Sequence, residues 1–221
     1  MIRQVEPTKK ENGASAAGLI LAAGASQRMG SPKQLLKWQG QILLDWTIDQ
    51  LLQARCPQIY VVLGCGAEKI LKQSRYGRED WNQVIFLENP QWRRGQGSSL
   101  STGLLANEES LRPAESLLVT TCDLPLVTAA DYLRLLAAKS DGVQVSATKH
   151  ADGGGIPAVL GRLFARRLLV EGLGVDPAAG ARQKLRALPE NQVTLVDIDG
   201  ASRDVDTVRS YQSALKYQPV C

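Results

Sequence analysis

The sequence has few aromatic residues and no long apolar run, and each shortage excludes a class of protein. Aromatic residues make up only 5% of the chain, too few for the base-stacking surface of a single-stranded nucleic-acid binder. The net charge of +4 therefore indicates a small anionic ligand rather than nucleic acid. No apolar run approaches the roughly 20 residues that cross a bilayer, so we expect a soluble protein without a membrane partner.

Cysteines are also scarce, and their spacing indicates the compartment. Cys56, Cys65, Cys122 and Cys221 form no Cys-x-x-Cys pair and lack the density of a secreted disulfide scaffold. A reducing compartment fits them best, and we expect a cytoplasmic protein. Residues 1–16 are polar and charged and lack the apolar block of a signal peptide. They are expected to form a disordered leader, followed by a single domain over residues 17–221.

Short apolar runs alternate with amphipathic stretches along this domain. The runs are typical of strands covered on both faces of a parallel sheet, and the alternation predicts an α/β fold, a three-layer α/β/α sandwich with a Rossmann-like, mostly parallel sheet. The segment Asp152-Gly-Gly-Gly155 interrupts the pattern, which predicts a hairpin or irregular excursion and a mixed edge of the sheet. Strands are expected at residues 18–22, 59–63, 84–87, 117–121 and 193–198, and helices at 43–54, 68–73, 98–107, 129–139, 163–171 and 208–216.

The loop after the first predicted strand has the composition of a phosphate-binding loop. Gly24 and Gly30 allow backbone N–H groups to turn toward phosphate oxygens, while Arg28 and Lys33 supply positive charge. The loop is neither a Walker A motif nor a dinucleotide Gly-x-Gly-x-x-Gly fingerprint. It therefore indicates a nucleotide phosphate site of another kind.

The segment Leu21-Ala-Ala-Gly-Ala-Ser-Gln-Arg-Met-Gly-Ser-Pro-Lys-Gln-Leu-Leu36 closely resembles the signature loop of the MobA-like nucleotidyltransferases. The resemblance implies a fold of the nucleotide-diphospho-sugar transferase type. Within the family, the Leu-Ala-Ala-Gly opening and the Gly-x-x-Ser-Ser-Leu segment look most like molybdenum cofactor cytidylyltransferases. Later segments match the family's motifs in the correct order, namely Val61-Val-Leu-Gly64, Asn89-Pro-Gln-Trp92, Gly95-Gln-Gly-Ser-Ser-Leu100, Cys122-Asp-Leu-Pro125 and Asp204-Val-Asp-Thr207.

The resemblance implies Mg²⁺-dependent transfer of CMP from CTP to molybdopterin, with release of pyrophosphate. It assigns catalytic roles to Arg28, Lys33 and Asp123, and it assigns the metal to Asp123 and Asp206. A transient contact with a molybdoenzyme or its maturation factor is a further expectation. The residues expected to bind the nucleotide are Leu21, Ala22, Ala23, Gly24, Ser26, Arg28, Gly30, Lys33, Gly64, Asn89, Gly97 and Ser98, and those expected to bind the acceptor are Ser99, Pro157 and Arg182.

Two departures from the family pattern fall in the acceptor half. The chain has Gly155-Ile-Pro157 where cytidylyltransferases commonly have Gly-His-Pro, and Gly-Ala-Arg182 is spaced further from Asp176. Cytidylyl or uridylyl transfer to a sugar or polyol phosphate, such as methylerythritol phosphate, is therefore an alternative. A non-catalytic nucleotide-binding maturation protein is another.

Several residues also have ordinary structural explanations. Asp123 and Asp206 each precede a predicted helix, where an aspartate can act as the N-cap. Cys122 is expected to be a small buried hydrophobe, and His150, the only histidine, is expected in a solvent-exposed turn.

Overall fold

The computed structural model of the protein describes residues 16–172 and 177–217. The expected disordered leader lies outside these residues except for its last residue, Ala16, which is buried. Cys221 also lies outside them. No helix in the described ranges is both long enough and apolar enough to span a membrane.

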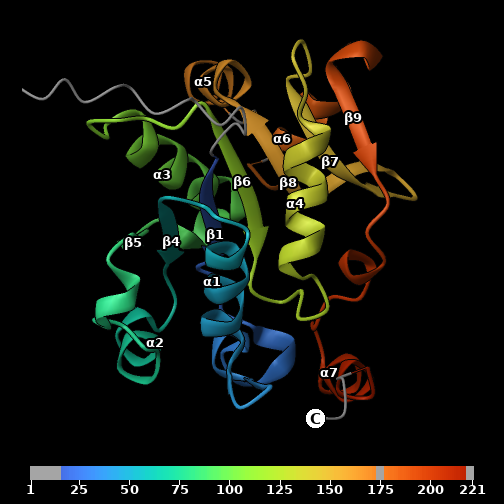
Figure 1. Ribbon diagram of the computed structural model, residues 1–221. Coiled ribbons are helices and arrows are strands. Elements are labelled where there is room, and N and C mark those ends of the chain that lie inside the picture. The colour runs from blue at the N-terminus through green and yellow to red at the C-terminus, as the bar shows by residue number, and fades with distance from the viewer. Residues whose placement is uncertain (1–15, 173–176, 218–221) are drawn as a thin grey trace, which may run out of the picture.

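A seven-stranded mixed sheet forms the centre of the molecule (Figure 1). Its strand order is β5-β4-β1-β6-β8-β7-β9, and β8 alone among them runs antiparallel to its neighbours. A two-stranded ribbon, β2 with β3, lies apart from it. The strands are β1 (Ala17–Ala22), β2 (Lys37–Trp38), β3 (Gln41–Ile42), β4 (Ile59–Leu63), β5 (Val84–Glu88), β6 (Ser116–Thr121), β7 (Val145–His150), β8 (Gly153–Gly161) and β9 (Val193–Val196).

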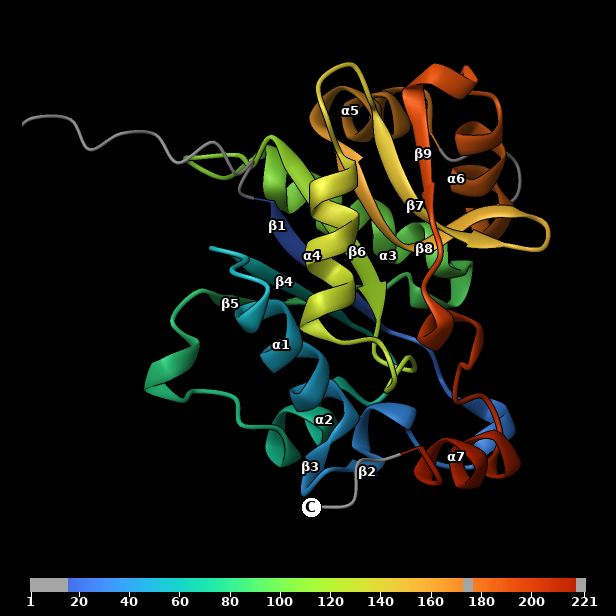
Figure 2. The ribbon, with the colours of Figure 1, turned by 45° about the vertical axis from the view of Figure 1, so that its right-hand side comes forward.

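Helices cover both faces of the large sheet, and this confirms the predicted α/β/α sandwich (Figures 1 and 2). One face packs against α1 and α4, and the other packs against α3, α5 and α6. Helix α7 lies beside the small ribbon. The helices are α1 (Leu43–Gln53), α2 (Ala67–Gln73), α3 (Gln96–Glu108), α4 (Ala129–Ala138), α5 (Arg162–Val170), α6 (Pro177–Arg186) and α7 (Val208–Leu215).

The mixed edge of the sheet is more regular than the sequence pattern indicates. The Gly-rich interruption is the start of β8, and β7 is a strand that the apolar pattern does not predict. The pattern misses β7 because the strand contains polar residues. Ser146 and Thr148 are fully buried, and their hydroxyls donate to the carbonyls of Leu135 and Pro157. The final strand ends at Val196, two residues earlier than expected.

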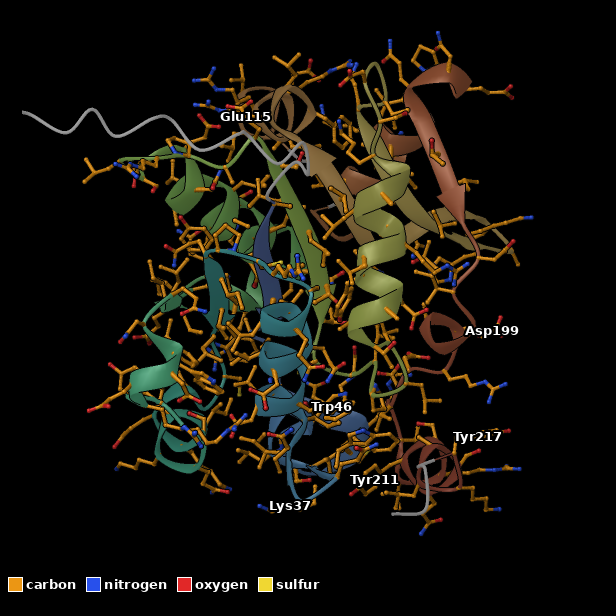
Figure 3. The ribbon with its side chains drawn as sticks, in the orientation of Figure 1. Lys37, Trp46, Glu115, Asp199, Tyr211 and Tyr217 are labelled. Atoms are coloured by element: carbon orange, nitrogen blue, oxygen red, sulfur yellow. The ribbon has the colours of Figure 1, made fainter. Side chains whose placement is uncertain are left out.

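The C-terminal helix α7 is held against the β2–β3 ribbon, and α1 is held against the loop that follows β6. Tyr211 on α7 donates its hydroxyl to the carbonyl of Lys37 at 2.5 Å, and Trp46 on α1 donates its indole N–H to the carbonyl of Pro125 at 3.1 Å (Figure 3). Val205 is completely buried in a small apolar cluster with Trp38, Leu43 and Ala214. These contacts fix the chain just before α7, where Asp206 lies.

The turn at Asp199–Ser202, marked by Asp199 in Figure 3, also packs tightly on this loop. A Cβ at Gly200 would lie 2.6 Å from the backbone oxygen of Leu126. We expect Gly200→Ala to lower the free energy of unfolding by about 1–3 kcal/mol, because backbone cannot yield as a side chain can. Urea denaturation measures the effect. Ser202→Ala, at an exposed position of the same turn, should change stability by less than about 0.5 kcal/mol, and equal stabilities for the two variants would contradict the close packing.

Candidate active site

A cavity of about 430 Å³ opens at the carboxyl ends of β1 and β6. In α/β sheets the loops that leave these strand ends converge on the ligand. The walls come from the first loop, the segment before α3, the end of β6 and the C-terminal segment. The lining residues are Leu21, Ala22, Ala23, Gly24, Ala25, Ser26, Gln27, Arg28, Lys33, Gln34, Trp92, Arg93, Gly95, Gln96, Ser99, Thr121, Cys122, Asp123 and Asp206.

The first loop reverses direction through two left-handed residues. Ser26 has a φ of 51° and Gly30 a φ of 68°, and the short 3₁₀ turn Gln27–Met29 lies between them. The backbone N–H of Lys33 donates to the Ser26 hydroxyl at 2.9 Å, which closes the loop. The loop therefore presents Arg28 and Lys33 to one side of the cavity.

Lys33 joins the two predicted metal ligands. Its ammonium lies 2.7 Å from Asp123 Oδ2 and 2.5 Å from Asp206 Oδ1. Arg28 donates to Asp206 Oδ2 at 2.5 Å, and the Thr121 hydroxyl donates to Asp123 Oδ1 at 2.5 Å. All four carboxylate oxygens therefore have a donor, and the two cations balance the two anions.

Neither aspartate is a helix cap. Thr128 caps α4 with Asp131, and Thr207 caps α7 with Ser210. The two aspartates are instead brought together by the backbone, because the N–H of Val205 donates to the carbonyl of Asp123 at 2.8 Å. The side chains of Asp123 and Asp206 are thus free to face the cavity.

The cluster shifts the pKa values of its members. Burial opposes the charged form of Lys33, but the neighbouring carboxylates of Asp123 and Asp206 outweigh it and raise the pKa of Lys33. The hydrogen bond from Lys33 lowers the pKa of Asp206 despite partial burial. Burial together with the negative charges of Asp206 and Asp123 raises the pKa of Asp204. The ion pair of Lys33 with Asp206 is therefore fully charged at neutral pH.

The donor set fits a hard divalent cation. The Lys33 ammonium is itself a cation held by both carboxylates, so the two aspartates are close enough to share one ion. Oxygen ligands suit Mg²⁺, which keeps several waters and binds through one or two carboxylates plus substrate phosphates. Within residues 16–172 and 177–217 there is no cluster of three or more His, Cys, Asp or Glu that could hold a metal. Asp123 and Asp206 are the residues that would hold such an ion.

Some of the predicted nucleotide-binding residues lie behind the wall of this cavity rather than on it. A Cβ on Gly64 would lie 2.6 Å from Trp92, so this glycine makes room for a tryptophan that lines the cavity. Asn89 is buried, and its amide donates to the hydroxyls of Ser98 and Ser99 at 2.9 and 3.1 Å. The predicted residues that do not line this cavity are Gly30, Gly64, Asn89, Gly97, Ser98, Pro157 and Arg182.

Other lining residues were not predicted. Gln34, Trp92, Arg93 and Gln96 lie inside or beside the motifs that carry the family resemblance, yet only their place in the structure brings them to the wall. Cys122 is buried as expected, and burial raises the pKa of its thiol to about 12. A thiolate at this position is therefore absent at neutral pH.

A second, apolar cavity of about 110 Å³ adjoins the first, with which it shares Leu21 and Gln96. Arg182 lines it and forms an ion pair with Asp152 at 2.9 Å, at an exposed position. Pro157 is buried and is not on its wall. The other lining residues are Gly97, Leu100, Val119, Gly154, Gly155, Ile156, Ala158, Leu160, Phe164, Leu168, Ala181 and Leu185.

The expectation of an exposed turn for His150 was wrong. His150 ends β7 and is half-buried, and its Nε2 lies 3.2 Å from the carbonyl of Ile156. Its ring lies against Gly155, where a Cβ would come within 2.7 Å of it.

Residues 18–195 match the model of the MobA-like NTP transferase domain. Among curated proteins, nicotine blue oxidoreductase of Paenarthrobacter nicotinovorans is 32% identical over 203 residues, covering 86% of this chain and 92% of that protein. A probable molybdenum cofactor guanylyltransferase of Deinococcus radiodurans is 33% identical, with 82% and 83% covered. The molybdenum cofactor cytidylyltransferase of Escherichia coli is 27% identical over a shorter match, with 56% and 59% covered.

Solved structures show the same fold. Rv0371c from Mycobacterium tuberculosis H37Rv is 25% identical, with a TM-score of 0.72 over 92% of this chain and 99% of that chain.

The bridging position of Lys33 leads to a prediction about metal binding. Lys33→Met removes a cation that competes for both carboxylates, so we expect the nucleotide-free protein to bind Mn²⁺ about tenfold more tightly. Electron paramagnetic resonance titration measures free Mn²⁺ directly. Lys37→Met, at an exposed lysine away from the cavity, should bind as the wild type does. Unchanged or weaker Mn²⁺ binding by the Lys33 variant would contradict a shared site.

Proposed function

Because the chain belongs to the MobA-like NTP transferase family and is a nucleotidyltransferase, we propose that it transfers CMP from CTP to molybdopterin. The observation that carries this proposal is the cluster of Arg28, Lys33, Asp123 and Asp206 at the rim of a cavity built on a glycine-containing loop. These are the charges that a triphosphate and its metal require.

In the proposed reaction, a phosphate oxygen of the acceptor attacks the α-phosphorus of CTP. A new P–O bond forms in line with the bond to the bridging oxygen, which breaks, and pyrophosphate leaves with that electron pair. The attacking phosphate is already an anion, so no side chain has to remove a proton from it. This accounts for a cavity wall without histidine among the described residues.

The chain's own contribution is alignment and charge neutralisation. Arg28 and Lys33 would contact the phosphates that become pyrophosphate, and the backbone N–H groups of the first loop would add hydrogen bonds. Asp123 and Asp206 would hold Mg²⁺, which supplies further positive charge at the reacting phosphates when it is bound. For this, Lys33 must exchange its carboxylate partners for phosphate oxygens. Its long flexible side chain permits the exchange.

The choice of acceptor is supported by the second cavity. Its wall is mainly Leu, Ile, Val, Phe, Ala and Gly, which suits a flat ring system such as a pterin. Arg182 at the margin supplies a charge for an anionic group of the acceptor.

The choice of CTP rests on the Leu-Ala-Ala-Gly opening of the first loop and on the relative named as a cytidylyltransferase. The guanylyltransferase of D. radiodurans makes GTP the nucleotide to be excluded by experiment. One relative has an oxidoreductase name, but the charged cluster of this chain is suited to phosphates and metal, and we therefore propose group transfer.

The decisive experiment measures pyrophosphate release with Mg²⁺ and each of the four ribonucleoside triphosphates, with and without molybdopterin. We expect release that requires both CTP and molybdopterin. Asp123→Asn should reduce it by about a hundredfold or more and leave the thermal unfolding midpoint nearly unchanged. Turnover with GTP alone would replace CTP in the proposal. Binding of nucleotide with turnover only on polyol phosphates would replace molybdopterin, and failure to bind any nucleotide would reject the proposal.

The second cavity can be filled without touching the first. Ala181→Trp on α6 should occupy it, so we expect the KM for molybdopterin to rise about tenfold or more while the KM for CTP stays within about twofold. Ala187→Trp, at an exposed position just after the same helix, is the matched control and should behave as the wild type does. Equal KM values for the acceptor in both variants would place it elsewhere.

A further inference from the structure

We propose that Gln34 is a positioning residue that orients two backbone amides of the first loop toward the bound nucleotide. This inference rests on the proposed nucleotide site but concerns a residue to which neither the motif nor the charge cluster assigns a role. Gln34 follows Lys33 in a short 3₁₀ turn, Lys33–Leu35, that passes beneath the loop. Only 2% of Gln34 is exposed, although it lies on the cavity wall.

The side-chain amide of Gln34 makes two hydrogen bonds to the loop backbone. Its Nε2 donates to the carbonyl of Ala22 at 2.7 Å and to the carbonyl of Gly24 at 3.2 Å. Both N–H bonds of the amide are therefore used. The orientation is fixed, because a flipped amide would direct its oxygen at two carbonyl oxygens.

These two bonds decide where the following amides point. The peptide bonds of the loop are trans, and in a trans peptide the C=O and the next N–H point in opposite directions. When the carbonyls of Ala22 and Gly24 face Gln34, the N–H groups of Ala23 and Ala25 face away from it, and both residues line the cavity. Within the described residues, neither N–H has a hydrogen-bond acceptor of its own. They are thus donors held ready for phosphate or base oxygens.

The other half of the Gln34 amide supports the same interpretation. Its Oε1 is buried and has no hydrogen-bond partner in the described part of the chain. An unpaired buried oxygen is unfavourable, and an apolar side chain of similar size, such as methionine, would avoid it. The useful part of this side chain is therefore its pair of donors.

Gln50 provides a matched control. It is also a buried glutamine, 4% exposed, and it also bonds to backbone, since its Oε1 accepts from the N–H of Ala129 at 2.9 Å. It joins α1 to α4 and does not line the nucleotide cavity. Gln34→Met and Gln50→Met thus replace buried glutamines of similar exposure, but the first releases two carbonyls of the nucleotide loop and the second releases one N–H at the start of α4.

The test compares the affinity of these two variants for a non-hydrolysable CTP analogue in the presence of Mg²⁺, by isothermal titration calorimetry. Both should lower the unfolding midpoint, because each loses hydrogen bonds to buried backbone. Only Gln34→Met should weaken the analogue, by about tenfold or more, and in turnover it should raise the KM for CTP more than it lowers kcat. Equal affinities in the two variants would overturn the positioning role, while a wild-type protein that binds no nucleotide would reject the proposed function itself.

A second variant keeps the test valid if Gln34→Met does not fold. Gln34→Glu has no donor when ionised, but its buried carboxyl regains one donor when it is protonated. Its affinity for the analogue should therefore recover in part as the pH is lowered, relative to the wild type at the same pH. An affinity ratio that does not depend on pH would contradict the role of the donors.

Discussion

The Lys33 ammonium between Asp123 and Asp206 is the interaction on which the site depends. Two partly buried carboxylates that approach one cation this closely repel one another when it is withdrawn. The arrangement therefore requires a positive charge at every stage, either from Lys33 or from a metal ion. Arg28 contributes at the exposed side, where screening weakens its effect. Under the proposed function, the same balance would let a triphosphate and its metal bind together. In the proposed reaction Lys33 would turn to the phosphates, and Asp123 and Asp206 would then hold the metal.

A backbone contact holds the two aspartates, which come from distant parts of the chain, close to each other. Asp123 lies in the turn just after β6, the central strand next to β1, and Asp206 comes from the segment that follows β9. The hydrogen bond from Val205 to the carbonyl of Asp123 joins them, and the burial of Val205 keeps water from competing for that bond. Helix α7 packs against the β2–β3 ribbon and so fixes the end of this segment. Its threonine cap leaves Asp206 free for the cavity.

Much of the fold and of the charged cluster was predictable from the sequence, and the features that were missed have physical reasons. Uninterrupted apolar runs mark β1, β4 and β6 because both faces of those strands are buried. Strand β7 contains buried Ser and Thr residues, which in a sequence are more typical of loops. Asp123 and Asp206 stand in recognisable motifs, but the choice between ligand and helix cap depends on which neighbour caps the helix, and only the structure shows this. Asn89 matches the family pattern, yet its contacts hold the start of α3. The role of Gln34 lies in the direction of its amide, which no spacing of residue types reveals.

The two cavities differ in character and adjoin at two shared residues. The larger cavity is lined by the charged cluster and the loop backbone, and the smaller is almost entirely apolar. They share Leu21 at the end of β1 and Gln96 at the first turn of α3. In the proposed reaction an acceptor seated in the apolar cavity would reach the α-phosphate across this boundary. Gln96 begins a helix of 13 residues, whose N-terminal end carries partial positive charge and favours anions. Under the proposed function the two phosphates would meet at this helix end, where the partial positive charge would oppose their repulsion.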